Sequence, residues 1–305
     1  MSDRPAQVPV PVFTHPSCER HDPGAGHPEA PSRLRAVRER LATEPAAALR
    51  EAPAAPEADL VAVHQQRYLE QVQGLVGAGG GALDADTIVN EHSWEAALHA
   101  AGAALAATDY ALAGQGNAFA AGRPPGHHAL AGAAMGFCLL ANAAIAARHA
   151  LGRGLGRVLI VDWDVHHGNG TQALVESDPA IRFISMHQWP WWPGTGAADE
   201  RGVGNVFNLP RPPGLPPARY VGDLWDTVVT ATSGWAPDLV LISAGFDSMR
   251  GDPLGGFTLE PEHFADLTHR MRERFAPAPV VGLLEGGYIP ARLAEGVAAH
   301  VRALA

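Results

Sequence analysis

The sequence predicts an α/β fold, in which a mostly parallel central sheet is flanked by helices and the functional site lies at the carboxyl ends of the strands. Short apolar, β-favouring runs alternate along the chain with longer segments of helical periodicity. Five of these runs are followed directly by polar residues suited to chemistry. The 305 residues are 47% hydrophobic, and no convincing linker divides them. We therefore expect one domain over residues 1–305, with 1–10 as a loosely ordered N-terminal segment.

The individual elements follow from the same patterns in chain order. Strands are expected at 11–14, 58–63, 117–121, 158–161, 182–186, 238–244 and 280–284. Helices are expected from Ser32, as the capping residue, through Leu41, and at 65–76, 93–113 and 142–149. The stretch 15–31 should be a long loop, and the glycine run 77–81 a flexible turn rather than a phosphate loop.

Charge and cysteine content narrow the class of protein. A formal net charge of -10 gives no electrostatic case for nucleic acid or an anionic membrane as the main partner. The N-terminus has no apolar signal region, and no stretch approaches the ~18 apolar residues of a membrane span, so we expect a cytoplasmic protein. Cys18 and Cys138 are too few for a disulfide framework or a thiolate zinc site, and each is expected to be a free thiol.

The segment 158–171 is the strongest single signal. Four apolar residues run into Asp162-Trp-Asp164-Val-His166-His-Gly. If the backbone stays extended there, Asp162, Asp164 and His166 point to one face. A salt-bridged acid pair at a strand end would explain a lone Asp-x-Asp. Two carboxylates and an imidazole converging on one face instead favour a divalent metal with N and O ligands.

Five strand ends carry groups of this kind. The segments are Arg123-Pro-Pro-Gly-His-His128, Asp162-Trp-Asp-Val-His166, His187-Gln-Trp, Gly245-Phe-Asp247-Ser and Glu285-Gly-Gly-Tyr288. Ligands bind at the carboxyl ends of strands in open parallel sheets. Packing alone does not explain why five strands deliver such residues to one edge, so we expect a single active site there.

Elementary chemistry assigns roles at this edge. Asp164, His166 and Asp247 can hold a divalent ion and leave an open position for water and a substrate oxygen. Water at such a site has a pKa lowered toward ~7 and becomes a nucleophile near neutrality.

The tandem histidines suit proton transfer. His127 and His128 follow a stiff Pro-Pro-Gly turn, and one imidazole can act as general base and then general acid. Asp162 and Asn169 are candidates to stand behind them, which would make the two imidazoles inequivalent, because an Asp raises basicity while an Asn only orients. A satisfied pair of polar core residues is the alternative. Tyr288, after two glycines, can donate a hydrogen bond to a developing oxyanion, although packing alone would also explain a tyrosine there.

Aromatic residues near the same strand ends suggest a tunnel. Phe137 with Trp189, Trp191 and Trp192 could wall a narrow passage for an aliphatic chain. Tryptophans beside prolines are also common packing anchors in loops.

The motifs, taken together and in order, resemble the histone deacetylase superfamily over about residues 12–300. They are Arg-Pro-Pro-Gly-His-His, Gly136-Phe-Cys, Asp-Trp-Asp-Val-His-His-Gly-Asn-Gly-Thr, Pro193-Gly-Thr-Gly, Gly245-Phe-Asp-Ser and Glu-Gly-Gly-Tyr. Asn169 and the segment His21-Asp-Pro-Gly-x-Gly-His-Pro-Glu29 are similar to the class II-like branch, which includes bacterial histone deacetylase-like amidohydrolases. The resemblance implies the single-domain, arginase/deacetylase-like α/β fold.

The resemblance also implies residue roles. Asp164, His166 and Asp247 would bind the catalytic zinc, Tyr288 would polarise the amide carbonyl, and His128 would be the acid/base with His127 electrostatic. The acyl-lysine channel would be lined by Gly136, Phe137 and Trp192, with Asp84 or Asp86 at the rim and Arg33 reaching an acetate-release pocket. A monovalent cation, K⁺, would be held by backbone oxygens of Asp162, Asp164, His166 and Met186 with the Ser185 side chain. Leu254 stands where the acetylpolyamine branch has a Glu, which counts against polyamines.

We therefore expect a zinc-dependent enzyme that removes an acetyl or short acyl group from a lysine-like primary amine on a peptide, protein or small molecule. Iron in place of zinc fits the same ligands. An acetylpolyamine hydrolase is the alternative with the same chemistry. An acyl-lysine binding module without turnover is less favoured because Tyr288 and the full ligand set are present, and a binuclear arginase-like site lacks the additional acids it would need. The oligomeric state stays open.

Overall fold

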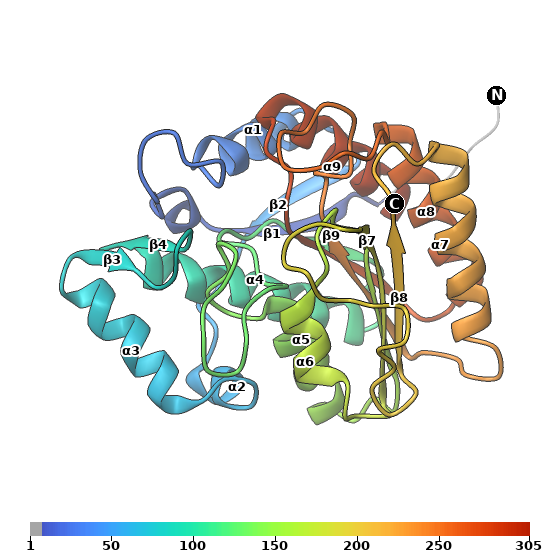
Figure 1. Cartoon of the computed structure of the whole chain (residues 1–305), viewed down its shortest axis with the longest axis horizontal. Coiled ribbons are helices and arrows are strands. Elements are labelled where there is room, and N and C mark those ends of the chain that lie inside the picture. Colours follow the sequence, from blue (N-terminus) through green and yellow to red (C-terminus); the bar gives the residue numbers. More distant parts are fainter. Residues whose placement is uncertain (1–7) are drawn as a thin grey trace.

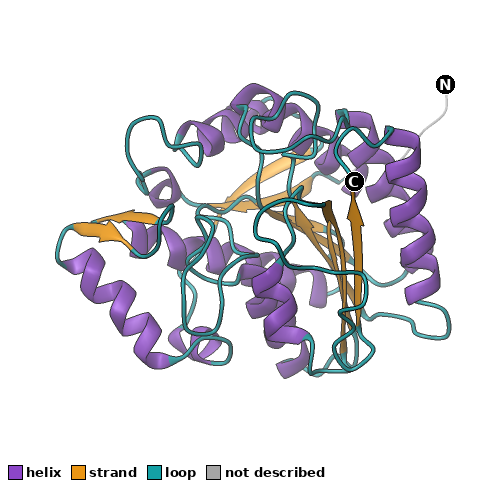
Figure 2. Ribbon diagram, viewed as in Figure 1, coloured by secondary structure: helices purple, strands orange, loops and turns teal. Residues whose placement is uncertain are grey.

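Eight strands form one sheet in the order β2-β1-β5-β10-β9-β6-β7-β8, and every neighbouring pair is parallel. The computed structural model describes residues 8–305 (Figures 1 and 2). The strands are β1 (Val10–Thr14), β2 (Ala47–Glu51), β5 (Ala118–Ala120), β6 (Val158–Asp162), β7 (Ile181–Gln188), β8 (Val206–Arg211), β9 (Leu239–Ala244) and β10 (Val280–Leu284). The predicted α/β class with a parallel central sheet is confirmed.

Helices cover both faces of this sheet. One layer contains α1 (Ser32–Ala42), α7 (Pro217–Ala231), α8 (Pro261–Phe275) and α9 (Pro290–Leu304), and the other contains α4 (Ser93–Leu112), α5 (Asn142–Gly152) and α6 (Asn169–Val175). In Figure 1, α1 and α9 lie along the top, whereas α5 and α6 lie below the centre. Burial on both sides explains the unbroken apolar strands, since Leu159 and Val161 of β6 enter one core while Val158 and Ile160 enter the other.

A peripheral layer packs beyond α4. It contains α2 (Glu57–Val61), α3 (Gln66–Gly77) and the antiparallel hairpin of β3 (Gly80–Ala82) and β4 (Ile88–Asn90), on the left of Figure 1. A separate apolar cluster that includes Leu69, Val72, Val89 and Ala101 joins this layer to α4. The turn between β3 and β4 carries Asp84 and Asp86.

Several expected elements differ in the structure. The strand expected at 58–63 is helix α2, because Pro56 and Glu57 provide a helix start and only Leu60 needs burial. Ser32 is the first residue of α1 rather than its cap, since Pro31 holds the cap position without a side-chain bond. The glycine run expected as a turn ends in β3, which starts at Gly80.

Two strands of the eight-stranded sheet, and β4 of the small hairpin, were not expected. Strand β2 is an exposed edge strand with little apolar pattern, and β8, at the other edge, is interrupted by polar Asn208 and by Pro210. At the N-terminus, Val10 already belongs to β1, although a loosely ordered segment was expected through residue 10, and residues 1–7 of that segment lie outside the described residues. A short 3-10 helix, Pro16–Glu19, lies within the expected early loop.

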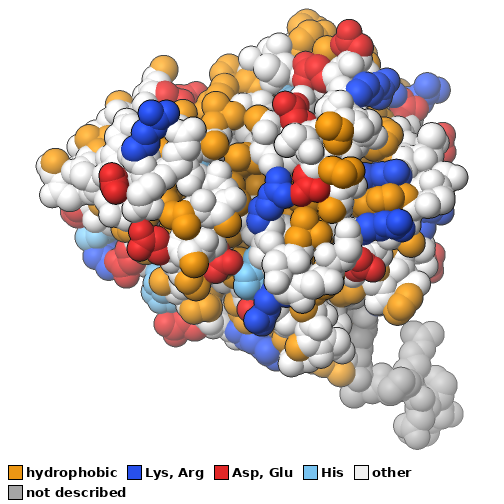
Figure 3. Space-filling model, turned by 90° about the horizontal axis from the view of Figure 1, so that it is seen from below, with side chains coloured by type: hydrophobic (Ala, Val, Ile, Leu, Met, Phe, Trp, Pro, Cys, Tyr) orange, Lys and Arg blue, Asp and Glu red, His pale blue; other side chains and the backbone are white. Residues whose placement is uncertain are grey.

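The surface shows no single dominant charge on the face drawn in Figure 3. Acidic and basic side chains lie interspersed there with apolar ones. Within residues 8–305, no helix combines the length and the apolar character that crossing a membrane requires.

Candidate active site

The site is assembled where neighbouring strands end. Strands β5, β10, β9, β6 and β7 are consecutive in the sheet, and the loops that follow them lie at its carboxyl edge. Alternation of strands with crossover helices forces all these ends to the same side. The expectation that distant segments of the chain meet at one edge is therefore confirmed.

Three ionisable side chains form a buried cluster at this edge. The His166 Nδ1 atom lies 3.1 Å from Asp164 Oδ1 and 3.3 Å from Asp247 Oδ2. Asp164 and Asp247 are fully buried, and His166 is 7% exposed. The other oxygens are fixed by the backbone, because Gly286 N–H donates to Asp164 Oδ2 and Val165 N–H donates to Asp247 Oδ1. Asp164 Oδ1 also accepts the His166 backbone N–H, and one ligand atom from each of the three residues lies within 4.8 Å of the others.

The cluster fits a divalent cation. Ligand atoms about 2.0–2.2 Å from one tetrahedral ion lie roughly 3.3–3.6 Å apart, close to the spacing of these side chains. Asp247 Oδ2 is a buried oxygen without a hydrogen-bond partner among the described residues. Burial, together with the charge of Asp164, raises the pKa of Asp247 to about 7. Burial opposes the charged form of His166, but the neighbouring carboxylates of Asp164 and Asp247 raise its pKa to about 9. The His166 imidazole therefore keeps its positive charge beside the two carboxylates. A bound metal ion would supply positive charge at the same place.

A glycine makes this close approach of strands possible. A Cβ atom on Gly286 would lie 2.0 Å from Asp247 Oδ2 and 2.5 Å from Asp164 Oδ2. Only a residue without a side chain leaves room for both carboxylates beside the β10 loop.

Asp162 lies outside the cluster. The prediction that it shares one face with Asp164 and His166 fails because β6 ends at Asp162 and the chain bends at 164–166. Its Oδ2 instead lies 3.0 Å from His127 Nδ1, and its Oδ1 accepts from Asp164 N–H.

The tandem histidines have different partners, as the sequence suggested. His127 Nδ1 is paired with Asp162, whereas His128 Nδ1 donates to Asn169 Oδ1 at 2.7 Å. Burial opposes the charged form of His127, but the carboxylates of Asp164 and Asp162 raise its pKa well above the usual value. Burial and the neighbouring charges of His127 and His166 lower the pKa of His128 well below the usual value. One imidazole is therefore a fixed cation and the other a neutral base.

Tyr288, in the loop after β10, lines the same pocket as His128 and His166. Its ring stacks edge-to-face with Phe137 at 5.9 Å, and the Arg33 guanidinium lies 4.9 Å from the ring centroid. Burial raises the pKa of the phenol well above its usual value, although Arg33 opposes this, so the hydroxyl remains a donor. Arg33 donates to the carbonyls of Gly287 and Glu285, both at 2.6 Å, and to Glu29. Its donors hold the Tyr288 loop; the expected contact with an acetate-release pocket stays a prediction.

A narrow pocket leads from the surface to this centre. Its volume is about 190 Å³, and its lining consists of Asp86, His128, Gly136, Phe137, His166, Trp191, Trp192, Leu254 and Tyr288. The predicted channel residues therefore meet. Of the two rim candidates, only Asp86 lines the pocket, because Asp84 Oδ1 accepts the backbone N–H groups of Asp86 and Thr87. Gly136, at φ 53°, has no room for a Cβ, which would lie 2.4 Å from the Trp192 ring.

Comparison with known proteins agrees with this geometry. Residues 27–304 match the family model of the histone deacetylase domain. The chain belongs to the histone deacetylase family. A crystal structure of the HDA15 HD domain superposes on this deacetylase with a TM-score of 0.92 at 36% identity, covering 97% of this chain and 90% of that one. The resemblance inferred from the motifs is confirmed.

Individual relatives include enzymes that act on amides. The histone deacetylase-like amidohydrolase of Pseudomonas aeruginosa is 40% identical over 277 residues, which cover 87% of this chain and 73% of the relative. Uncharacterized protein slr0245 of Synechocystis sp. is 43% identical and covers 93% of this chain and 96% of its own. Polyamine deacetylase HDAC10 of Homo sapiens is 39% identical, but the match spans only 44% of its length and 90% of this chain. This protein is thus an enzyme of the deacetylase and amidohydrolase type.

Some candidates lie away from the centre of the deacetylase site. His187 is buried within β7, with Nδ1 3.0 Å from Ser185 Oγ and Nε2 3.0 Å from the Gly196 carbonyl, so the fifth strand end contributes tryptophans rather than this imidazole. Trp189 is 36% exposed and does not line the pocket. Ser185 pairs with Asp162 across β7 and β6, and the cation site proposed there, including Met186, stays a prediction.

Sequence reasoning overlooked three acids that support the site. The Glu285 carboxylate accepts from Gly126 N–H at 2.7 Å and His127 N–H at 3.2 Å, which fixes the turn before the tandem histidines. Its place directly after a buried strand was a signal that could have been used. Glu29, fully buried, binds Arg123 and Arg33. Asp252 contacts the Tyr288 backbone, and its loop position gave no signal.

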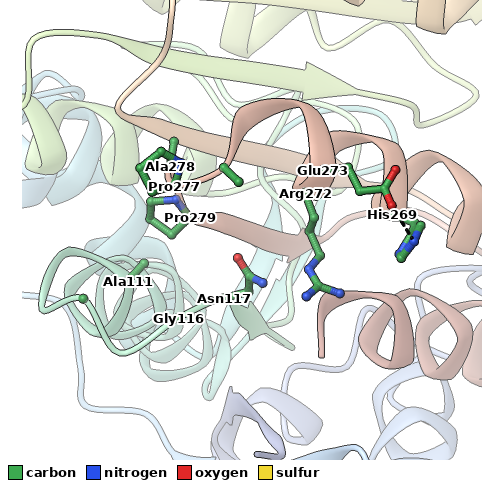
Figure 4. A pocket seen from close by; sticks show the side chains of 11 residues that line it. Ala111, Gly116, Asn117, His269, Arg272, Glu273, Pro277, Ala278 and Pro279 are labelled. Carbon is green, nitrogen blue, oxygen red and sulfur yellow. Dashed lines mark ion pairs between the residues drawn. The ribbon is translucent and has the colours of Figure 1, made fainter. Parts of the chain in front are cut away.

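A second hollow lies at the opposite, amino edge of the sheet (Figure 4). It has a volume of about 380 Å³ and is lined by the segments before β5 and β10 and by α8. Figure 4 shows Arg272 and Asn117 at its wall and the ion pair of His269 with Glu273. Arg272 donates to the carbonyls of Ala303 and Ala305, so its guanidinium group caps the C-terminal end of α9.

Proposed function

We propose that this protein is a zinc-dependent deacylase that hydrolyses the amide between an acetyl or other short acyl group and a lysine-like primary amine. The observation that best supports this proposal is the buried cluster of Asp164, His166 and Asp247 at the end of a narrow, aromatic-lined pocket. A neutral histidine, His128, and a phenol, Tyr288, line the same pocket, and amide hydrolysis needs groups of these two kinds.

His128 is the general base and then the general acid. Asn169 accepts from Nδ1–H, and an amide oxygen only accepts, so Nδ1 carries the proton and Nε2 carries the free lone pair. His128 Nε2 takes a proton as water adds to the acyl carbon. The same proton passes to the nitrogen as the C–N bond breaks, which releases a carboxylic acid and a free amine.

His127 and Tyr288 stabilise charge during this step. Asp162 fixes the His127 ring, whose positive charge lies beside the reacting centre without needing to move a proton. The Tyr288 hydroxyl donates a hydrogen bond to the carbonyl oxygen as negative charge develops there.

Asp164, His166 and Asp247 would hold the metal. When bound, a divalent ion polarises the acyl carbonyl and lowers the pKa of water. Two carboxylates and one imidazole suit zinc and also Fe²⁺, and metal content after purification with each ion distinguishes them. The K⁺ assignment to Asp162, Asp164, His166, Ser185 and Met186 is part of the same proposal and rests on the family resemblance.

The pocket mouth favours an acyl-lysine substrate over a polyamine. Phe137, Trp192 and Leu254 offer apolar walls for an aliphatic chain, and Asp86 is the one carboxylate in the lining. Leu254 is apolar and itself offers a distant ammonium no charged partner. The likeness to a polyamine deacetylase keeps acetylpolyamines as the second candidate.

The test is hydrolysis by zinc-loaded protein of an acetyl-lysine peptide, acetylputrescine and acetylspermidine, with Tyr288→Phe run in parallel. Released acetate is measured for all three substrates, because acetylputrescine and acetylspermidine carry a free amine before hydrolysis. We expect the peptide to be the best substrate and Tyr288→Phe to lower kcat by about 10²- to 10³-fold. Preference for the polyamines would select the second candidate, and absence of acetate release from all three would overturn the proposal.

A further inference from the structure

The loop after β9 holds the pocket together through one carboxylate. This loop contains the metal-site residue Asp247, the mouth residue Leu254 and, between them, Asp252, which is 8% exposed. We infer that Asp252 is a positioning residue for Tyr288, and that it couples the phenol to the wall of the pocket. The inference rests on the proposed function, since it assigns a role in that reaction.

The two oxygens of Asp252 serve two different loops. Oδ2 accepts the backbone N–H of Tyr288 at 2.7 Å, across 36 positions of sequence. Oδ1 accepts the backbone N–H of Leu254 at 3.0 Å. A single buried side chain therefore fixes where the Tyr288 backbone starts and where the Leu254 side chain enters the pocket.

A local turn does not explain this arrangement. Asp often accepts the N–H two residues ahead, and the Leu254 bond alone would be such a turn. The Tyr288 bond is different, because Tyr288 is held on the other side of its loop by Arg33, which binds the carbonyls of Gly287 and Glu285. Gly287 has φ 121°, a backbone conformation that residues with a side chain rarely adopt, so the hydrogen bonds on both sides of this segment hold an unusual turn.

A third loop is joined to the same point. The Trp191 Nε1–H group donates to the Leu254 carbonyl at 2.9 Å. Loops from β7, β9 and β10 are thus connected in sequence by Trp191, Leu254, Asp252 and Tyr288. Because Trp191, Leu254 and Tyr288 all line the pocket, the width of the mouth and the placement of the phenol are linked.

Loss of the Asp252 to Tyr288 bond should act on the reaction through the phenol. A misplacement of a reacting group by ~1 Å can cost about 100-fold in rate. Asn at position 252 keeps the shape but offers one oxygen, so it satisfies one of the two N–H groups and presents an N–H₂ to the other. Ser at this position keeps a turn bond to Leu254 and is too short to reach Tyr288.

The experiment is a double-mutant cycle on kcat, measured in the steady state with an acetyl-lysine peptide in excess over zinc-loaded enzyme. Asp252→Asn and Asp252→Ser are each made in the wild-type and in the Tyr288→Phe background. We expect a fall of about 10- to 100-fold in the wild-type background and less than about 2-fold in the Tyr288→Phe background, because there the hydroxyl is already absent. Trp191→Phe, which keeps a ring and loses the bond to Leu254, should raise KM and lower kcat less than Asp252→Ser does, because it reaches the phenol only through Leu254 and Asp252.

Controls separate this role from general destabilisation. Asp22→Asn removes a similar turn carboxylate, bonded to Gly24 N–H on the exposed early loop, and should leave kcat unchanged. Zinc content and thermal unfolding are measured for every variant, and Asp252→Ser is decisive if Asp252→Asn does not fold. Equal losses of kcat in both backgrounds would overturn the inference, as would full activity of Asp252→Ser. A wild type without deacylase activity would instead overturn the proposed function.

Discussion

The two edges of the central sheet both carry hollows, and the smaller hollow carries the chemistry. At the carboxyl edge a pocket of about 190 Å³ ends at the cluster of Asp164, His166 and Asp247, where burial and the charges of the neighbouring residues shift the pKa values of His166 and Asp247. At the amino edge a hollow of about 380 Å³ is walled by groups whose hydrogen bonds are used by the fold, such as Arg272 on the end of α9. The volume of a hollow therefore does not identify the active site here. The site is identified by a buried cluster of two carboxylates and one imidazole, in which one carboxylate oxygen has no hydrogen-bond partner among the described residues.

The largest expected effect separates the two edges directly. Asp247→Ala removes one of the metal-site carboxylates, and we expect kcat/KM to fall by more than about 10³-fold with loss of bound zinc. Arg272→Ala at the amino edge should leave kcat/KM unchanged, although loss of its bonds to two carbonyls should cost about 1 kcal/mol of stability. Activity assays and elemental analysis of the purified proteins provide the measurement. A zinc-loaded Arg272→Ala protein with strongly reduced turnover would contradict the comparison.

The same side chain can be tested at both edges. Asn169→Ala removes the acceptor that fixes the His128 tautomer, and loss of such an orienting partner typically costs about 10- to 100-fold. Asn117 at the amino edge also makes two bonds, to Leu304 O and from Val280 N–H, and Asn117→Ala should alter stability but not turnover. The measurement is kcat of Asn169→Ala and Asn117→Ala in the steady state, with the zinc content of each protein as a control. Equal kcat values for the two variants would count against the assignment of His128 as the base.

Sequence reasoning located the site because local patterns encode it. The unbroken apolar run of β6 and the acids after it identify a buried strand end, and five such ends must meet at one edge of a parallel sheet. The same reasoning placed Asp162 with Asp164 and His166, which the structure contradicts because the backbone bends after the strand. Side-chain alternation holds only while the strand continues.

What the sequence could not provide is long-range bonding at the site. The strand expected at 58–63 failed because a short apolar run alone does not distinguish a strand from a helical turn. Glu285 and Asp252 support the active site through backbone groups far away in the chain, and Glu29 does so through the Arg123 guanidinium. No local sequence pattern identifies such partners. His187 satisfied the pattern of a strand end and yet turns toward Gly196.

The carboxyl edge also depends on a buried ionic cluster, which a stability measurement can test. Burial alone would raise the pKa of Glu29, but Arg123, His21 and Arg33 hold it well below the usual value. Glu29→Gln leaves two buried guanidinium groups without their carboxylate, and we expect a loss of about 3–5 kcal/mol in urea unfolding. Glu95→Gln, which breaks an exposed pair with Arg20, should cost less than about 1 kcal/mol.

The pH dependence of this effect has a defined sign. Because the pKa of Glu29 is depressed on folding, its contribution is present above the unfolded value of about 4.3 and is lost as the pH falls toward the folded value. The stability difference between wild type and Glu29→Gln should therefore shrink below about pH 4. A difference that is the same at all pH values would mean that the carboxylate charge is not what stabilises the cluster.

The smallest expected effect concerns an ionisable residue remote from the active site. His149 of α5 lies 2.8 Å from Asp59 and 2.9 Å from Asp109, and these bonds raise its pKa although burial opposes the charged form. A raised pKa contributes stability below the unfolded value of about 6.5, and this contribution is lost as the pH rises through the folded value. His149→Gln should therefore cost up to about 1 kcal/mol near pH 6 and less near pH 8, with kcat unchanged. Urea unfolding of both proteins at the two pH values gives the measurement, with His269→Gln, from the exposed pair with Glu273, as the control. A penalty that grows from pH 6 to pH 8 would reverse the sign and contradict the ionic role, whereas a loss of turnover would extend the active-site network into α5.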